Sequence, residues 1–341
     1  MKNLNLNIKS TFLLVLLGSL VCCSSSKDDG APVFGGPISA TYTNPVYKSD
    51  APDPTLIRGK DGYFYAYTTG SVIHKSQDLV NWTDEGGAFD NTVFPSFLAG
   101  GSLWAPDVQY VNGKYVMYYV LSKWGEIYQN GIGVATALKP SGPFTDLGSI
   151  LISKDCGVLN SIDPCYYEEN GHKYLFWGSF QGIYYIELTA NGLKVKSGST
   201  PVKVAGTAFE GTMIYKRNNY YYLFASIGSC CDGLNSTYTT VVGRSESLFG
   251  PYVNKNGDAM LNNAYTKVIE ANDAFKGTGH NSEIITDDKG ETWFLYHAYR
   301  VVDEKAGRCM LLDKINWVDD WPVVNDGTPT TTKQQGPYFK N

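Results

Sequence analysis

The chain has 341 residues, of which 43% are hydrophobic and 18% are charged, so it can bury a large core and does not belong to the disordered class. Its net charge of −5 and the absence of a Lys/Arg run argue against nucleic acid as a partner, because phosphate binding needs a concentrated basic surface. Aromatic residues make up 14% of the chain, which suits both β-strands and a site that stacks on sugar faces.

Residues 1–23 have the pattern of an export signal. Lys2 and Lys9 precede an apolar run that is too short to span a bilayer and that ends at Cys22 and Cys23. Because the run ends on cysteine, it resembles a bacterial lipoprotein signal in which Cys22 or Cys23 is lipidated. An ordinary secretion signal is the alternative.

The segment that follows the signal is polar and then rich in Gly and Pro. Its acidic part, residues 24–29, resembles the tag that sends some lipoproteins to the outer face of the outer membrane. We therefore predict a surface-exposed outer membrane lipoprotein, with a flexible linker over residues 24–40 and the folded domain over residues 41–341.

Five segments of that domain share one pattern: a polar or ionisable residue, a strand, a polar turn and an aromatic strand. They open on Asp53, Asp107, Asp163, Glu210 and His280. Their spacing of about 47 to 70 residues is typical of propeller blades with four strands each.

The second half of several repeats also recurs. Residues 76–82, 137–144 and 245–252 resemble the outer hairpin of a blade, and helical periodicity is nearly absent. We predict an all-β fold, a five-bladed β-propeller, with a β-sandwich as the alternative. Past Asp326 the chain is polar and rich in threonine, which indicates an extended closing segment or a loose tail.

The repeated position of the ionisable residues has a functional consequence. In a propeller the innermost strands surround the axis, so residues at equivalent strand starts converge on one central pocket. A lone Asp before Pro is more often a turn residue. Asp53, Asp163 and Glu210, however, occupy the same place in their repeats. Turn chemistry does not require such a repeated position.

Five motifs, taken together and in order, resemble glycoside hydrolase family 43, and within it the arabinan endo-1,5-α-L-arabinanases. They are Ala-Pro-Asp-Pro at 51–54, Leu-Trp-Ala-Pro-Asp-Val at 103–108, Asn-Ser-Ile-Asp-Pro at 160–164, Phe-Glu-Gly at 209–211 and Gly-His-Asn-Ser at 279–282. The resemblance implies an inverting hydrolase that cleaves arabinan or arabino-oligosaccharides.

The same resemblance implies a role for each carboxylate. Asp53 is expected to be the general base and Glu210 the general acid, while Asp163 raises the pKa of the acid and orients it. Asp107 is expected to be structural. The expected sugar contacts, besides Asp53, are Trp104, Trp124, Gly125, Asn160, Ser161, Ile162, Ser179, Phe180 and Gln181. For Trp104, a role in core packing is nearly as well supported by the sequence as a sugar contact.

His280 has no zinc partners in the sequence, and the resemblance instead implies that it binds a Ca²⁺ ion held otherwise by water. Arg244 is best interpreted as a scaffold residue. Cys230 and Cys231 resemble a disulfide between adjacent residues in arabinanases, and the odd number of cysteines beyond Cys22 and Cys23 leaves at least one free.

Three functions remain open from the sequence. The first is endo-arabinanase activity, the second an exo-acting arabinofuranosidase or β-xylosidase of the same family, and the third a glycan-binding surface lipoprotein without turnover. The three intact carboxylates disfavour the third function, because a pure binding protein does not need them. We predict a monomer.

Overall fold

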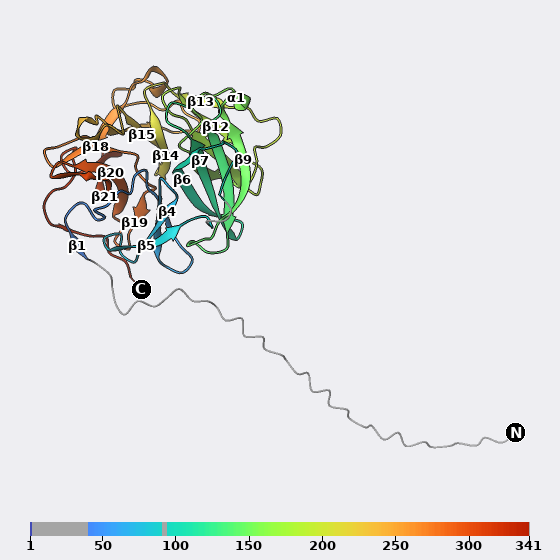
Figure 1. Ribbon diagram of the computed structural model, residues 1–341, viewed down its shortest axis with the longest axis horizontal. Coiled ribbons are helices and arrows are strands. Elements are labelled where there is room, and N and C mark those ends of the chain that lie inside the picture. Colours follow the sequence, from blue (N-terminus) through green and yellow to red (C-terminus); the bar gives the residue numbers. More distant parts are fainter. Residues whose placement is uncertain (2–39, 91–93, 341) are drawn as a thin grey trace.

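The structure is a computed structural model that describes Met1, residues 40–90 and residues 94–340 (Figure 1). The predicted signal over residues 1–23 and linker over residues 24–40 lie outside the described residues, apart from Met1 and Ala40. Within the described part, no helix has the length and apolar character needed to cross a membrane.

Three antiparallel sheets of four strands follow one another along the chain, each with its strands in sequence order. The first contains β2 (Thr55–Arg58), β3 (Phe64–Thr68), β4 (Val72–Ser76) and β5 (Trp82–Gly87). The second contains β6 (Ser102–Val111), β7 (Lys114–Ser122), β8 (Gly131–Ala137) and β9 (Thr145–Ile152). The third contains β10 (Cys165–Glu169), β11 (His172–Trp177), β12 (Ile183–Glu187) and β13 (Val202–Ala205).

The rest of the domain forms one nine-stranded sheet, because a parallel bridge between Thr239 and Thr278 joins β16 to β18. Its strands are β14 (Glu210–Arg217), β15 (Tyr220–Ile227), β16 (Thr239–Ser245), β17 (Thr266–Ile269), β18 (Phe275–Gly279), β19 (Ile285–Thr286), β20 (Thr292–Arg300), β21 (Asp303–Val318) and β22 (Trp321–Val323). The short helices are α1 (Ser153–Cys156), η1 (Gly233–Asn235) and η2 (Met260–Asn262). The predicted all-β class is therefore confirmed.

The first four repeats are the hairpins β2–β3, β6–β7, β10–β11 and β14–β15. Asn112 and Gly113 connect β6 to β7 with φ angles of 50° and 84°, as a two-residue turn with both residues left-handed requires. Of the segments predicted as outer hairpins, 76–82 connects β4 to β5, 137–144 connects β8 to β9, and 245–252 begins the longer connection from β16 to β17.

The fifth repeat differs, because His280 follows β18 instead of opening a strand. Ser282 lies beside Leu295 of β20: its N–H donates to the Leu295 carbonyl at 2.8 Å. The Leu295 N–H, however, donates to the Ser282 hydroxyl at 2.9 Å. In a regular pair of β-strands it would donate to a backbone carbonyl. The regular strand therefore begins only at Ile285.

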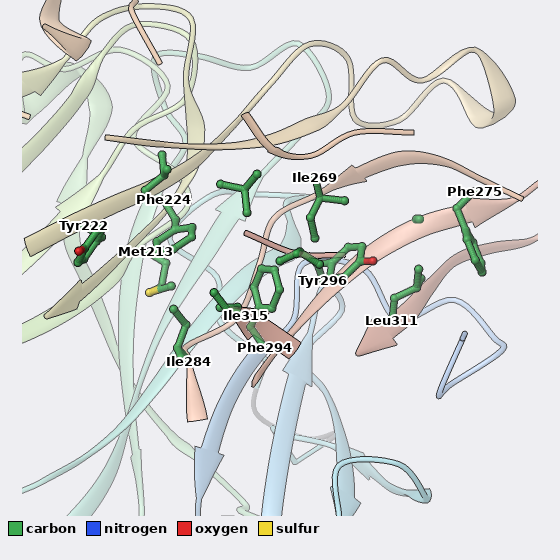
Figure 2. Packing of buried hydrophobic residues seen from close by; sticks show 14 of the residues in the cluster. Met213, Tyr222, Phe224, Ile269, Phe275, Ile284, Phe294, Tyr296, Leu311 and Ile315 are labelled. Carbon is green, nitrogen blue, oxygen red and sulfur yellow. The ribbon is translucent and has the colours of Figure 1, made fainter. Parts of the chain in front are cut away.

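Apolar clusters pack between neighbouring groups of strands. Figure 2 shows one of them, in which Met213 and Phe224 pack with Phe294, Tyr296 and other buried residues of β17 to β21. Such burial contributes about 1.5 to 3 kcal/mol for each large side chain. Another cluster combines residues of the first and last sheets: Leu56, Phe64, Leu295 and Met310 are among its members.

The two ends of the domain lie together (Figure 1). β1 (Thr41–Tyr42) pairs with β23 (Gln334–Gln335), and the buried ring of Phe339 lies 4.6 Å from that of Phe64. The C-terminal segment therefore packs on the domain and is not a loose tail.

Candidate active site

A cavity of about 570 Å³ brings together most of the residues that the sequence singled out. Those that line it are Asp53, Trp104, Trp124, Gly125, Asn160, Ile162, Asp163, Ser179, Phe180, Glu210 and His280. They come from all four large sheets and the loops between the strands, so the fold gathers residues that are far apart in the sequence.

The backbone at the strand starts is unusual. Asp53 and Asp163 each lie two residues before a strand and immediately before a proline, with φ angles of 57° and 58°. A residue before proline prefers extended conformations, and a left-handed residue other than glycine costs about 1 to 3 kcal/mol. His280, with φ 49°, shares this conformation. Such strain is typical of residues that are positioned for function.

Asp53 is held as a carboxylate. Arg308 Nη1 lies 3.1 Å from its Oδ1, the Thr69 hydroxyl donates to its Oδ2 at 2.6 Å, and His280 Nδ1 lies 3.3 Å from its Oδ1. Its N–H donates to Nδ1 of His297, a histidine whose pKa burial lowers to about 4. Burial alone would raise the pKa of Asp53, but the charges of Arg308 and His280 hold it well below its usual range.

Glu210 has the opposite electrostatic environment. Burial and the neighbouring Asp163 carboxylate raise the pKa of Glu210 to about 7, although the Ser179 hydroxyl, which donates to Oε2 at 2.6 Å, opposes the shift. Burial likewise raises the pKa of Asp163, to about 6, and its Oδ2 accepts the N–H of Gly211 at 3.1 Å. The cavity thus contains one ionised carboxylate and one carboxyl that keeps its proton near neutral pH, the arrangement that acid–base catalysis needs.

Aromatic faces border the cavity. The side chain of Trp124 is 81% exposed, and its ring contacts that of Trp104 edge to face at 6.5 Å. Trp104 also packs against the cluster between the second and third sheets, so its ring both lines the cavity and contacts the core. Phe180 is 37% exposed. Exposed rings at a polar cavity suit stacking on the apolar faces of sugars.

Two residues predicted to contact sugar do not line the cavity. Ser161 is fully buried, and its hydroxyl accepts from Trp177 Nε1 at 2.9 Å and donates to the Val158 carbonyl at 2.8 Å. Gln181 is exposed and lies outside the cavity lining. Ser161 and Gln181 are neighbours of Asn160 and Phe180 in the sequence, but unlike those two residues they do not line the cavity.

The two residues predicted to be structural have structural contacts. Asp107 is buried outside the cavity, where it accepts hydrogen bonds from the Tyr166 N–H and from Gln109 Nε2. Arg244 donates to the carbonyls of Asp319 and Asp320 at 3.1 and 2.9 Å, also outside the cavity.

Sequence reasoning missed four residues of the site: Thr69, Tyr238, His297 and Arg308. Arg308 carries a signal that could have been noticed, because it is a charged residue directly before the buried apolar run 309–312 of β21. Thr69 lies in a polar turn and Tyr238 in a loop, and only the tertiary structure brings either of them to the carboxylates.

A cation at His280 would find few protein ligands. Among the described residues there is no group of three or more His, Cys, Asp or Glu side chains that could hold a metal ion. The side chain of His280 is 15% exposed, and its Nε2 forms no hydrogen bond in the described part of the chain. The next residue, Asn281, has a buried Oδ1 without a partner there. Burial lowers the pKa of His280, but the Asp53 carboxylate and its neighbours raise it to about 9, so the imidazole would have to lose a proton before it could hold a cation.

The disulfide that the resemblance implies is present. Cys230 and Cys231 are bonded to each other and line the cavity. Cys156, Cys165 and Cys309 are free thiols. The cavity wall therefore includes a small, stiff ring between adjacent residues.

The chain is similar to proteins of known activity along most of its length. Residues 42–322 match the model described as glycosyl hydrolases family 43. The chain is 33% identical to an extracellular endo-α-(1→5)-L-arabinanase of Bacillus subtilis, over 79% of this chain and 86% of the relative. It is 31% identical to an extracellular exo-α-(1→5)-L-arabinofuranosidase of Cellvibrio japonicus, over 81% and 87% respectively.

Among solved structures, the α-L-arabinanase of Cellvibrio cellulosa in complex with arabinohexaose superimposes with a TM-score of 0.73. It is 28% identical, and the match covers 82% of this chain and 96% of that chain.

Proposed function

Because this chain belongs to glycosyl hydrolase family 43, we propose that it is an endo-acting hydrolase that cleaves α-1,5 bonds between L-arabinofuranose residues of arabinan. The observation that carries the proposal is the pair of carboxyl groups in one cavity: Asp53 is held ionised and Glu210 keeps its proton near pH 7. Two such groups are what hydrolysis of a glycosidic bond requires.

In the proposed mechanism Asp53 is the general base. It accepts a proton from a water molecule that attacks the anomeric carbon, and Arg308 keeps the carboxylate ionised beforehand. Glu210 donates its proton to the leaving oxygen, so that neither product leaves as an alkoxide. Asp163 touches neither reacting group in this scheme; its negative charge keeps the pKa of Glu210 high.

Inversion follows from direct attack by water without a covalent intermediate. Proton NMR during the first turnovers on an arabino-oligosaccharide tests it, because an inverting enzyme releases the β-anomer from an α-linked substrate. Initial release of the α-anomer would contradict the proposal.

The endo mode rests on the relative from Bacillus subtilis, whose name gives that mode. The test is to digest linear debranched arabinan with the domain over residues 41–341 and to follow the products by chromatography, with Glu210→Gln as the control. A spread of oligosaccharides that is absent from the variant supports both the mode and the acid.

The alternative is an exo-acting enzyme of the same family, an arabinofuranosidase or β-xylosidase. The relative from Cellvibrio japonicus favours its arabinose-specific form, because that protein is named as an exo-arabinofuranosidase. Release of only mono- or disaccharide from the first time point would support it. Retained binding without any product would point to a glycan-binding protein.

For the architecture we propose a five-bladed propeller. In this interpretation β14 to β17 form the fourth blade and β18 to β22 the fifth, although one parallel bridge joins them. The apolar cluster shared by the first and last sheets and the pairing of β1 with β23 support a closed ring.

We propose a Ca²⁺ ion bound by His280 and otherwise by water. When bound, its positive charge would lower the energy of the carboxylate form of Asp53. Isothermal titration with CaCl₂ tests the site directly, with His280→Ala as the variant. Equal heats from the two proteins would contradict the assignment.

The extracellular relatives support a location outside the cytoplasm. We propose that the protein is a monomer anchored to the outer membrane through a lipid on Cys22 or Cys23 and exposed at the cell surface. Mass spectrometry of the mature N-terminus tests the lipid, since an unmodified N-terminus would exclude the anchor. Light scattering of the domain over residues 41–341 tests the monomer.

A further inference from the structure

A chain of buried and half-buried side-chain hydrogen bonds leads from α1 to Glu210. The Ser153 hydroxyl donates to Asn130 Oδ1 at 2.6 Å, and Asn130 Nδ2 donates to Asn160 Oδ1 at 2.8 Å. Asn160 Nδ2 donates to Ser179 Oγ at 3.0 Å, and the Ser179 hydroxyl donates to Glu210 Oε2 at 2.6 Å. Every donor in this chain points toward Glu210.

Backbone groups fix that direction at two points. The Ser161 N–H donates to Ser153 Oγ at 2.8 Å, which leaves the Ser153 proton free for Asn130. Asn160 Nδ2 also donates to the Ser179 carbonyl at 3.3 Å. Because an N–H only donates and a carbonyl only accepts, neither the Asn160 amide nor the Asn130 amide can be turned around without breaking a bond.

The direction determines what Ser179 does. Its oxygen accepts from Asn160 Nδ2, and its own proton is directed at Glu210 Oε2. Donation from Ser179 to Oε2 favours Oε1 as the oxygen that carries the proton of the acid form; the Tyr238 hydroxyl is a second hydrogen-bond partner of Glu210.

We infer that Asn130 and Ser153 are positioning residues that keep the acidic proton of Glu210 on the oxygen available to the leaving group. Both side chains are fully buried and neither lines the cavity, so they act through Asn160 and Ser179 and not on the substrate. The inference rests on the proposed role of Glu210 as the acid. It also gives Asn160 and Ser179, which line the cavity, a function in placing that proton.

The anchor of this chain lies in a loop that borders the cavity. Asn130 ends the loop that carries Trp124, and its carbonyl accepts the Ser153 N–H at 3.0 Å. The same loop is bonded to residue 160, because the Ile127 carbonyl accepts the Asn160 N–H at 2.8 Å. The position of the acid thus depends on the contact between two loops, through Asn130 and Ser153, which do not line the cavity.

Asn130→Leu tests the inference, because leucine has a similar size and no hydrogen-bonding group. With arabino-oligosaccharides, whose leaving group needs a proton, we expect kcat to fall about 10-fold, a part of the 10²- to 10⁴-fold that general acid catalysis supplies. With the 4-nitrophenyl glycoside of the same oligosaccharide, kcat should fall less than about 2-fold, since that leaving group departs as the anion. KM should change by less than about 2-fold with either substrate.

Controls separate this result from a general loss of structure. Asn254→Leu removes another buried amide, outside the cavity lining, and should leave the ratio of the two kcat values unchanged. Ser153→Ala should show the same dependence of kcat on the leaving group, with a smaller loss of kcat. It replaces Asn130→Leu as the test if that variant does not fold.

An equal loss on both substrates for Asn130→Leu and Ser153→Ala would overturn the inference, because it would show a structural role only. Glu210→Gln tests the proposed function separately. If Glu210→Gln retains full activity on the oligosaccharide, Glu210 is not the acid. If Glu210→Gln is inactive while Asn130→Leu and Ser153→Ala behave like wild type, only the inference fails.

Discussion

Arg308 and Asp53 form the closest charge pair of the cavity: Nη1 of the arginine lies 3.1 Å from Oδ1 and 3.4 Å from Oδ2 of the aspartate. Their side chains are only 15% and 12% exposed. β21 therefore brings a cation to a carboxylate that precedes β2, and the ionised state of the base depends on a residue 255 positions away in the sequence.

Arg308→Met should lower kcat about 100-fold, because Asp53 would no longer be held as a carboxylate ready to accept a proton. It should also reduce the free energy of unfolding by about 3 kcal/mol, since a buried charge loses its partner. Steady-state kinetics and urea denaturation measure the two effects. Arg300→Met, which breaks an ion pair outside the cavity lining, should leave kcat within about 2-fold of wild type. A variant at 308 with normal kcat would contradict the proposed role of Arg308.

Ser179→Ala should shift the alkaline limb of the kcat profile to higher pH. The hydroxyl stabilises the ionised form of Glu210, whose pKa is about 7, so its loss raises that pKa and keeps the acid protonated at higher pH. A hydrogen bond to a charged group contributes about 1.5 kcal/mol, so we expect a shift of about one pH unit. The charged and titratable groups that face Glu210 are Asp163, Tyr238 and His280, and all three remain in the variant. No shift, or a shift to lower pH, would contradict the assignment.

Asp163→Asn should move the same limb in the opposite direction. Asp163 raises the pKa of Glu210 by charge repulsion, so the neutral amide lets Glu210 lose its proton at lower pH. The amide oxygen can still accept the Gly211 N–H, which preserves the local backbone. Measured between pH 5 and 9, kcat on arabino-oligosaccharides should begin to fall about one pH unit earlier than in wild type. A profile identical to that of wild type would show that Asp163 does not tune the acid.

Trp124→Ala should weaken substrate binding without affecting the fold. The ring is 81% exposed, so little packing is lost, but the variant removes a stacking surface worth about 1 to 1.5 kcal/mol. We expect KM for arabinohexaose to rise about 10-fold while the melting temperature changes by less than about 2 °C. Phe94, also exposed but outside the cavity lining, supplies the control Phe94→Ala, for which KM should not change.

Replacement of both Cys230 and Cys231 by serine should have little effect on stability. A disulfide stabilises a protein mainly by closing a long loop in the unfolded chain, and this one joins adjacent residues. We expect a loss of about 1 kcal/mol or less in the free energy of unfolding. KM for oligosaccharides should change more clearly, because the ring lines the cavity. A large loss of stability with unchanged KM would assign the disulfide to the fold instead of the site.

The repeated hairpins and the identity of the carboxylates could be predicted from the sequence because both are local. Alternating aromatic strands and Asn-Gly turns specify their own hairpins, as residues 107–118 do in β6 and β7. Asp53, Asp163 and Glu210 open repeats of one pattern and all three line the cavity, whereas Asp107, which opens another copy, lies outside it. The resemblance to a family then supplied their roles.

The rest of the site depends on contacts between distant segments. No local pattern shows that Arg308 reaches Asp53, or that the Ser161 hydroxyl is taken up by Trp177 and Val158 instead of facing the substrate. The pKa values that distinguish the base from the acid come from burial and from neighbours on other strands. The chain of hydrogen bonds from Ser153 to Glu210 likewise joins four segments. The sequence by itself determined the repeated hairpins and placed Asp53, Asp163 and Glu210 at the starts of repeats, because periodicity is a property of the chain. Only the tertiary structure decided their protonation states and orientations, because those depend on which charges and hydrogen-bond donors are packed around each group.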